Sequence, residues 1–189
     1  MEKIIAIAAI TNAVRQMDKS AVFIAIDGRC AAGKTTLAAL LAKQLACHVI
    51  HMDDFFLRPV QRTPQRLAQP GGNIDYERFI DEVLTPLKQA KSFTYQAFDC
   101  KTMQLAAVRE ITPNPITIIE GSYSCHPAFG DFYDLRVFLD VDPEKQMQRI
   151  QARNDKQAAI QFRDRWIPLE ESYFQAFEVQ QHCQFVFQT

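Results

Sequence analysis

Glycine is scarce in this sequence: six of the 189 residues are glycine, about half of the usual share of ~7 %. Each glycine therefore calls for a structural reason. The chain also lacks any apolar run near the ~20 residues that a membrane-spanning helix needs. Its N-terminus has no basic segment followed by an apolar core and a cleavage site. We therefore expect a soluble, cytoplasmic chain with no membrane contact.

An excess of one charge is also missing, because 21 Lys and Arg residues nearly balance 22 Asp and Glu residues. General nucleic-acid binding needs a basic surface that displaces counterions, so we expect no nucleic-acid partner, whereas small anions need only a few local donors. The cysteines are odd in number, far apart and without a C-x-x-C pair: Cys30, Cys47, Cys100, Cys125 and Cys183. This pattern favours a reducing compartment over a disulfide scaffold.

The spacing of apolar residues predicts strands that alternate with helices. Expected helices cover residues 2–17, 35–46, 76–90, 143–153 and 166–179, and expected strands cover 21–26, 48–52, 115–119, 135–141 and 185–187. We expect a flap at 54–75 and a small hairpin at 93–111, outside the main sheet. This order is typical of an α/β fold with helices on both faces of a central parallel sheet, here of about five strands. No linker or repeat divides residues 1–189, so we expect one domain.

One motif carries most of the functional information. The segment from Gly28 to Thr35 matches G-x-x-x-x-G-K-[ST], with an apolar strand before it and a helix after it. Such a loop, the P-loop, turns backbone N–H groups and a helix N-terminus toward a phosphate. The residues expected to bind the nucleotide are Gly28, Arg29, Cys30, Ala31, Ala32, Gly33, Lys34, Thr35 and Thr36. Lys34 would reach the β- and γ-phosphates of ATP, and the Thr35 hydroxyl would hold Mg²⁺; the alternative is a plain strand-to-helix turn with a surface lysine.

Carboxylates follow two of the expected strands. Asp53 and Asp54 end the second strand, and Glu120 ends the run 116–119 just before Gly121. Ligands gather at the carboxyl ends of parallel strands, so one aspartate is a candidate base for an acceptor hydroxyl and Glu120 a candidate Mg²⁺ ligand. The alternatives are an aspartate pair that caps a turn and a solvated acid at a strand end.

Arginines cluster in the polar stretch before the last helix. Arg149, Arg153, Arg163 and Arg165 lie there, and on a segment that closes over a triphosphate they would neutralise charge and exclude water. The alternative is an ordinary solvated face. His48 and His51 are close in sequence, but on a strand they point to opposite faces, so we expect no shared metal.

With these residues in place, the sequence resembles the uridine kinase and phosphoribulokinase family of P-loop kinases, in its bacterial uridine kinase-like branch. The resemblance runs from about residue 23 to 173 and is carried by IAIDGRCAAGKTTLA, HMDDFF, IIEGSYS, FLDVDPEKQMQRI and RWIPLEESYF. It implies a three-layer P-loop NTPase fold of the nucleoside-monophosphate-kinase-like type, with a lid at about 150–165.

The resemblance also implies roles for single residues. Asp53 would be the catalytic base, and Glu120 would lie near the metal and the substrate. The residues expected to bind the acceptor are Phe55, Asp75, which would hold sugar hydroxyls, Phe98 and Asp99; the lid arginines would be Arg149, Arg153 and Arg165. One departure stands out, because residues 100–103 (CKTM) replace the stretch in which uridine kinases carry a base-recognising histidine.

The hypothesis is a kinase that transfers the γ-phosphoryl of Mg-ATP to a hydroxyl of a uridine- or cytidine-like nucleoside or a similar small metabolite. Pantothenate, a pyridine riboside or a sugar phosphate are alternative acceptors, the last favoured by Arg58, Arg62 and Arg66 in the flap. Another alternative is a regulatory nucleotide-binding NTPase, although the guanine-reading N-K-x-D segment is missing; a P-loop fold without catalysis and a homo-oligomer both stay open.

Overall fold

A parallel sheet forms the centre of the molecule in the computed structural model, which describes residues 2–189. Its strands are β1 (Val22–Gly28), β2 (His48–His51), β5 (Ile116–Glu120), β6 (Leu135–Asp140) and β7 (Phe185–Gln188). Their spatial order within the described residues is β2-β5-β1-β6-β7, and every neighbouring pair is parallel. The predicted five-stranded parallel sheet is therefore confirmed.

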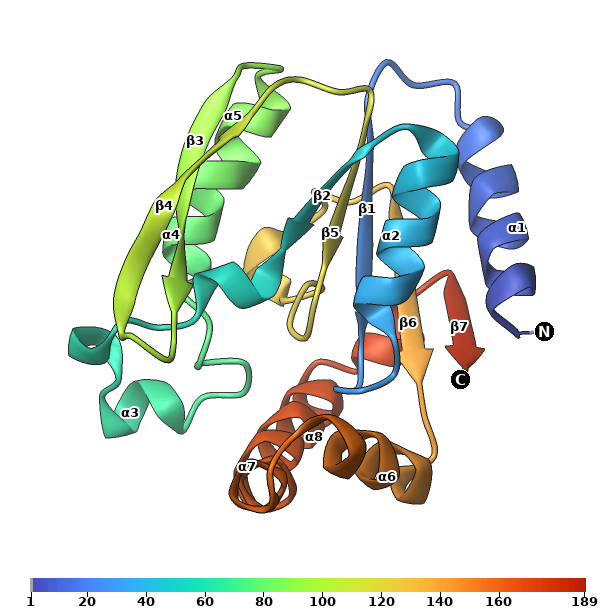
Figure 1. The fold of residues 1–189 in the computed structure, drawn as a ribbon. Helices are drawn as coiled ribbons and strands as arrows, with labels where there is room; N and C mark the ends of the chain where they lie inside the picture. The colour runs from blue at the N-terminus through green and yellow to red at the C-terminus, as the bar shows by residue number, and fades with distance from the viewer. Residues whose placement is uncertain (1) are drawn as a thin grey trace.

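The two faces of the sheet bury separate sets of apolar side chains. Successive residues of β1 point to opposite faces, so Ile24 and Ile26 join one core while Ala25 joins the other. The helices α1 (Glu2–Arg15) and α2 (Lys34–Leu45) cover the first face. The second face is covered by a continuous helix of α4 (Tyr76–Phe79), a π-turn (Ile80–Leu84) and α5 (Thr85–Lys88), and by α8 (Ile167–Ala176). The fold thus has three layers, as Figure 1 shows.

A two-stranded antiparallel hairpin stands apart from the central sheet. It consists of β3 (Phe93–Asp99) and β4 (Gln104–Ile111), and β4 is almost entirely exposed. Figure 1 shows the hairpin beside the α4–α5 helix, at the far edge from β7. The predicted hairpin outside the main sheet is confirmed.

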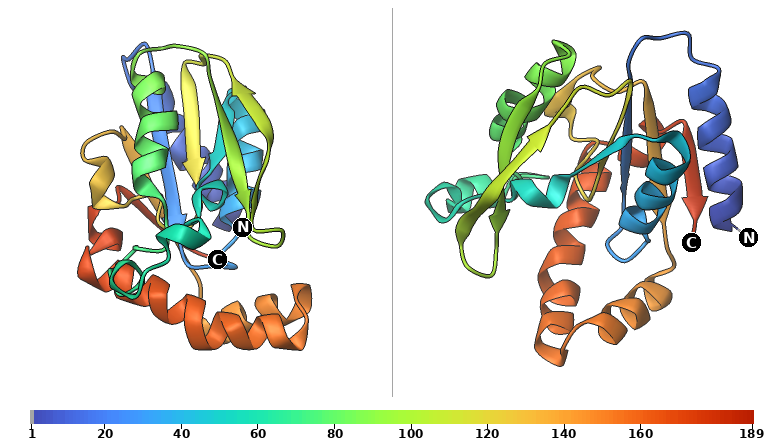
Figure 2. Two further views of the ribbon diagram at one scale, coloured as in Figure 1. Left: turned by 90° about the vertical axis from the view of Figure 1, so that its left-hand side faces the viewer. Right: turned by 45° about the horizontal axis from the view of Figure 1, so that its top comes forward.

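The flap and lid segments are more helical than their composition suggested. The flap contains α3 (Pro64–Leu67), which starts where the Thr63 hydroxyl accepts the N–H of Arg66. In the lid region, α6 (Pro143–Arg153) is followed by α7 (Lys156–Gln161), a π-turn (Phe162–Trp166) and α8. Asp155 caps α7 by accepting the N–H of Ala158. These helices lie across one end of the sheet in both views of Figure 2.

No helix in the described part of the chain is long and apolar enough to span a bilayer.

Candidate active site

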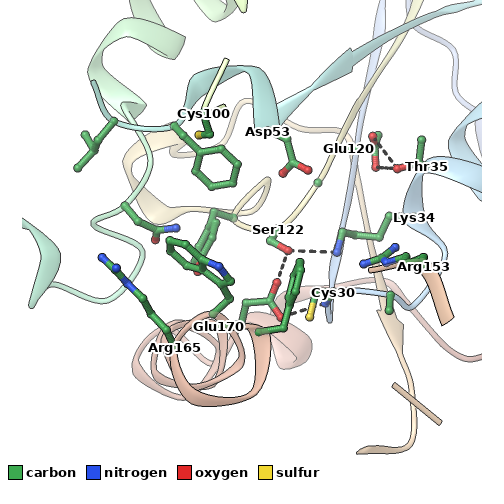
Figure 3. Close-up of a pocket in the computed structure, with 18 of the residues that line it drawn as sticks. Cys30, Lys34, Thr35, Asp53, Cys100, Glu120, Ser122, Arg153, Arg165 and Glu170 are labelled. Atoms are coloured by element: carbon green, nitrogen blue, oxygen red, sulfur yellow. Dashed lines mark hydrogen bonds between the residues drawn. The ribbon is translucent and has the colours of Figure 1, made fainter. Parts of the chain in front are cut away.

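A cavity of about 510 Å³ opens where the strands β1, β2 and β5 end. Its walls come from the P-loop, the ends of β2 and β5, the flap, the hairpin turn and the lid helices (Figure 3). The predicted residues that line it are Cys30, Ala31, Gly33, Lys34, Thr35, Thr36, Asp53, Glu120, Arg153 and Arg165. The fold therefore brings most of the P-loop, the strand-end acids Asp53 and Glu120 and two lid arginines to one space.

The P-loop takes its shape from glycine and from contacts with β6. Gly28 has φ +128°, and a Cβ there would lie 2.1 Å from the carbonyl oxygen of Leu139. Any other residue would have to push β6 away. The Lys34 ammonium is buried at the loop and donates to the carbonyls of Gly28 at 2.6 Å and Arg29 at 3.0 Å and to Ser122 Oγ at 3.2 Å. A cation and the start of α2 thus meet at the phosphate-binding loop.

Thr35 and Glu120 lie together, as the sequence predicted for a metal site. The Thr35 hydroxyl is 3.2 Å from both carboxylate oxygens of Glu120, which is buried. His51, which the sequence left without a role, lies 2.5 Å from Glu120 through its Nδ1 atom. The parallel register pairs His51 with Glu120, and their hydrogen bond is the main cause that raises the pKa of His51. A hydroxyl and a carboxylate are oxygen ligands of the kind Mg²⁺ prefers.

The adjacent aspartates at the end of β2 serve different parts of the structure. Asp53 faces the cavity, so it is accessible to solvent while protein surrounds it on the other sides. Desolvation is the main cause that raises its pKa to about 6, and nearby Lys34 opposes this shift. Asp54 turns away and accepts hydrogen bonds from Tyr95 at 3.0 Å and Arg109 at 2.6 Å. Asp54 therefore ties the hairpin to β2, which leaves Asp53 as the aspartate of this pair in the cavity.

Gly121 allows the chain after β5 to pass close to Asp53. It has φ +136°, and a Cβ there would lie 2.9 Å from the Cβ of Met52 and 3.3 Å from Asp53 Oδ1. A larger residue would displace the turn that carries the Asp53 carboxylate. This is the structural reason for a glycine directly after Glu120.

Glu170 of α8 is a residue at the site that the sequence analysis did not single out. Its buried carboxylate accepts the N–H of Cys30 at 2.9 Å and the hydroxyl of Ser122 at 2.5 Å, and Ser122 in turn accepts from Lys34 (Figure 3). Burial, followed by the charge of Glu170, raises the pKa of the Cys30 thiol to about 12. Cys30 is therefore a neutral thiol near pH 7. Residue 170 and the P-loop are 140 positions apart, so local sequence patterns carry no signal for this contact.

The three predicted lid arginines occupy different places. Both Arg153 and Arg165 line the cavity; in Figure 3 Arg153 lies on the same side as Lys34 and Arg165 on the other side. Arg149 is not part of the cavity lining in residues 2–189; it donates to the carbonyl of Ala31 at 3.0 Å and to Thr189 Oγ1 at 3.1 Å. Arg149 thus supports the P-loop from outside the cavity.

Four predicted acceptor-binding residues are not part of the cavity lining in residues 2–189: Phe55, Asp75, Phe98 and Asp99. Phe55 is fully buried and packs edge-on against Phe79 at 4.9 Å. Asp75 is 1 % exposed, begins α4 by accepting the N–H of Arg78 at 3.2 Å, and also accepts from Gln61 at 2.8 Å. Phe98 is buried. Asp99 accepts the N–H of Lys101 at 2.7 Å in the hairpin turn. The flap instead contributes Phe56, Leu57, Arg62, Leu67 and Asn73 to the lining.

Three expected nucleotide-binding residues also lie off the cavity lining of the described chain. Gly28 approaches β6, Ala32 is buried in the core, and Arg29 donates to Asp140 at 2.6 Å and pairs with Glu171. These residues shape and hold the P-loop, while the residues on either side of them face the cavity.

Comparisons with known proteins show which folds and sequences this chain is similar to. No protein-family model matches the sequence. A possible uridine kinase from Bacillus stearothermophilus has a structure similar over 99 % of this chain and 100 % of that one, with a TM-score of 0.75 and 22 % identity. The chain therefore has the predicted three-layer α/β P-loop NTPase fold.

Two further proteins are similar to this chain. A protein proposed to be a fructose transport system kinase, from Silicibacter sp. TM1040, matches with a TM-score of 0.72 and 18 % identity over 98 % of each chain. Uridine kinase-like protein 4 of Arabidopsis thaliana is 22 % identical over 148 residues, which cover 74 % of this chain and 31 % of that protein. The chain thus spans about a third of the length of this curated relative. These findings confirm the resemblance to uridine kinases and related P-loop kinases.

Proposed function

We propose that this protein is a phosphotransferase that moves the γ-phosphoryl group of Mg-ATP to a hydroxyl of a small metabolite. The observation that carries the proposal is the position of Asp53, which shares one cavity with Lys34, Thr35 and Glu120. Its pKa is raised to about 6, which suits a base that works near neutral pH. A nucleotide-binding loop that shares a cavity with a carboxylate able to reach an acceptor is what transfer to a hydroxyl requires.

The nucleotide side of the site is assigned to the P-loop. Lys34 and the backbone N–H groups that follow it bind the phosphates, helped by the N-terminus of α2. Thr35 and Glu120 are the residues that hold Mg²⁺. Bound there, Mg²⁺ neutralises charge on the phosphates. Arg153 lines the cavity on the side of Lys34 in Figure 3, which supports a role in neutralising charge that develops on the transferred group.

Asp53 acts on the acceptor side. It orients the acceptor hydroxyl and takes up its proton as the hydroxyl oxygen attacks the γ-phosphorus. An O–P bond forms to the acceptor, the bond between the γ-phosphorus and the β–γ bridging oxygen breaks, and ADP leaves with that electron pair. The similarity to uridine kinases supports a nucleoside as one candidate acceptor. Pantothenate, pyridine ribosides and sugar phosphates are the other candidates.

The test is ADP formation from Mg-ATP with a panel of these acceptors, compared with ADP formation when no acceptor is added. We expect one acceptor to stimulate turnover and to gain a phosphate visible by mass spectrometry. In Asp53→Asn the rate should fall by roughly 10²- to 10⁴-fold, while Mg-ATP still raises the melting temperature. Asp131→Asn, an exposed aspartate, is the matched control and should keep its rate.

Two results would count against this function. Full phosphotransfer by Asp53→Asn would remove the role of Asp53 as base. ATP hydrolysis that no acceptor increases would favour the regulatory NTPase instead.

A further inference from the structure

Three guanidinium groups line the cavity without a carboxylate partner in residues 2–189: Arg62, Arg153 and Arg165. Arg153 lies on the side of Lys34, where a triphosphate accounts for its charge (Figure 3). Neither the nucleotide nor Mg²⁺ accounts for the charges of Arg62 and Arg165. Arg62 is partly exposed and Arg165 is exposed, so both are accessible from the cavity, and a guanidinium there without a carboxylate partner is free to bind an anionic ligand.

Arg62 is held in a defined orientation by neutral groups. Its Nε atom donates to the carbonyl of Leu57 at 2.9 Å, and its guanidinium lies 5.7 Å from the ring centre of Phe98. One terminal nitrogen lies 3.9 Å from Cys100 Sγ. Because these partners carry no charge, the positive charge of Arg62 is not neutralised by the protein. The largest cationic effects on Asp53 come from Lys34 and His51, not from Arg62.

The neighbouring flap arginines, Arg58 and Arg66, differ from Arg62 because each has a carboxylate partner. Arg66 donates hydrogen bonds to both carboxylate oxygens of Glu77, at 2.6 and 2.7 Å. Arg58 lies 3.7 Å from the buried carboxylate of Asp75. Neither is part of the cavity lining of the described chain. Of these three flap arginines, Arg62 alone combines a place in the cavity with the lack of a carboxylate.

Arg165, in the π-turn of the lid region, supplies a second cation to the cavity lining. It stacks on Trp166, with its guanidinium 4.8 Å from the ring centre, and Trp166 also lines the cavity. The nearby acid, Asp164, is paired with Arg163 at 2.6 Å. Asp164 therefore does not pair with Arg165, and the charge of Arg165 is available to a ligand in the cavity.

The flap side also lacks the group that a neutral sugar acceptor would need. Asp75, expected to bind sugar hydroxyls, is closed off by Arg78 and Gln61. The flap residues that do face the cavity are apolar apart from Arg62 and the amide of Asn73. The flap residues that line the cavity therefore include a cation that can bind an anion, Arg62. They include no carboxylate that could accept hydrogen bonds from the hydroxyls of a sugar.

We infer that the acceptor carries an anionic group, a phosphate or a carboxylate, which Arg62 and Arg165 bind on the side of the cavity away from Lys34 while the acceptor hydroxyl meets Asp53. This inference rests on the proposed function for the transfer step, but not for the binding step. Guanidinium groups bind both anions through charge-assisted hydrogen bonds, so the two sources are separated by experiment.

The binding test fills the P-loop with a non-hydrolysable Mg-ATP analogue and then adds matched pairs of compounds. The pairs are pantothenate against pantothenol and fructose 1-phosphate against fructose. We expect one anionic member to raise the melting temperature and its neutral partner to have little effect. Arg62→Gln and Arg165→Gln should each remove the rise, Arg62→Lys should restore part of it, and Arg58→Gln, a flap arginine outside the cavity lining, should keep it.

The transfer test uses the same pairs with Mg-ATP. For the anionic acceptor, Arg62→Gln should raise the KM roughly tenfold or more with a smaller change in kcat, and the KM for ATP should stay constant. Neutral members that bind or react as well as their anionic partners, or anion binding that Arg62→Gln leaves intact, would overturn the inference. Anion binding that depends on Arg62 without any phosphoryl transfer would uphold the anion site and overturn the kinase proposal. Phosphoryl transfer to a neutral acceptor but to no anionic one would uphold the kinase proposal and overturn the anion site.

Discussion

Single residues at this site owe their chemistry to surroundings that chain neighbours do not share. Asp53 and Asp54 are adjacent, yet Asp54 is paired with Arg109 while Asp53 faces the cavity. Desolvation of Asp53 is the main cause of its raised pKa, and the charges of Glu120 and Glu170 add to the shift. Perturbed acids in a cavity are typical of functional sites.

The raised pKa of Asp53 predicts how activity depends on pH. A protonated carboxyl cannot accept a proton, so kcat/KM should fall as pH drops through about 6 and should level off above it. The measurement is a pH profile of kcat/KM for the acceptor between pH 5 and 8. Asp53→Asn should lose this limb of the profile, whereas a limb centred near the ordinary aspartate value would contradict the assignment.

At the scale of elements, the lid helices hold the P-loop directly. Glu170 of α8 accepts the N–H of Cys30, and Gln146 of α6 donates to the carbonyl of Cys30 at 3.0 Å. Arg149, also of α6, donates to the carbonyl of Ala31. Movement of α6 or α8 would therefore reach the loop through these hydrogen bonds.

Removal of the contact from α8 should cost stability. In Glu170→Ala the N–H of Cys30 and the Ser122 hydroxyl lose a buried charged partner, which costs about 1–3 kcal/mol. For a chain of this size the melting temperature should fall by roughly 2–4 °C per kcal/mol. Thermal unfolding followed by circular dichroism measures the change.

The neighbouring acid provides the matched control for this variant. Glu171 pairs with Arg29, and both side chains are partly exposed, so solvent screens this pair more than it screens the buried contacts of Glu170. Glu171→Ala should therefore unfold closer to the wild-type temperature. Equal losses in the two variants would show that the link from Glu170 to the P-loop adds no particular stability.

At the scale of the whole molecule, the strand order places the candidate groups in one cavity. β1 and β2 are not neighbours, because β5 lies between them. The P-loop after β1, Glu120 at the end of β5 and Asp53 after β2 therefore follow three strands that lie side by side. The lid helices close the same end of the sheet (Figure 2).

Mg-ATP binding at this end should stabilise the entire fold. A ligand at 100 times its Kd adds about 2.7 kcal/mol, which corresponds to a rise of roughly 5–11 °C in melting temperature. Chelation of Mg²⁺ with EDTA should reduce the rise. Lys34→Ala should abolish it, whereas the exposed Lys43→Ala, at the other end of α2, should keep it. An equal rise in Lys34→Ala would place the nucleotide elsewhere.

The sequence by itself determined the parallel sheet, the P-loop and the acids at the strand ends, because apolar periodicity and a contiguous motif are local properties of the chain. It could not show that the carboxylate of Asp75 accepts hydrogen bonds from within the flap or that Phe55 belongs to the core. Both facts depend on packing against other segments. Only the tertiary structure shows that Glu170 belongs to the site and that Arg62, unlike Arg58 and Arg66, lines the cavity. Glu170 meets the P-loop across 140 residues, and the charge of Arg62 is significant only because its neighbours in space leave it unpaired.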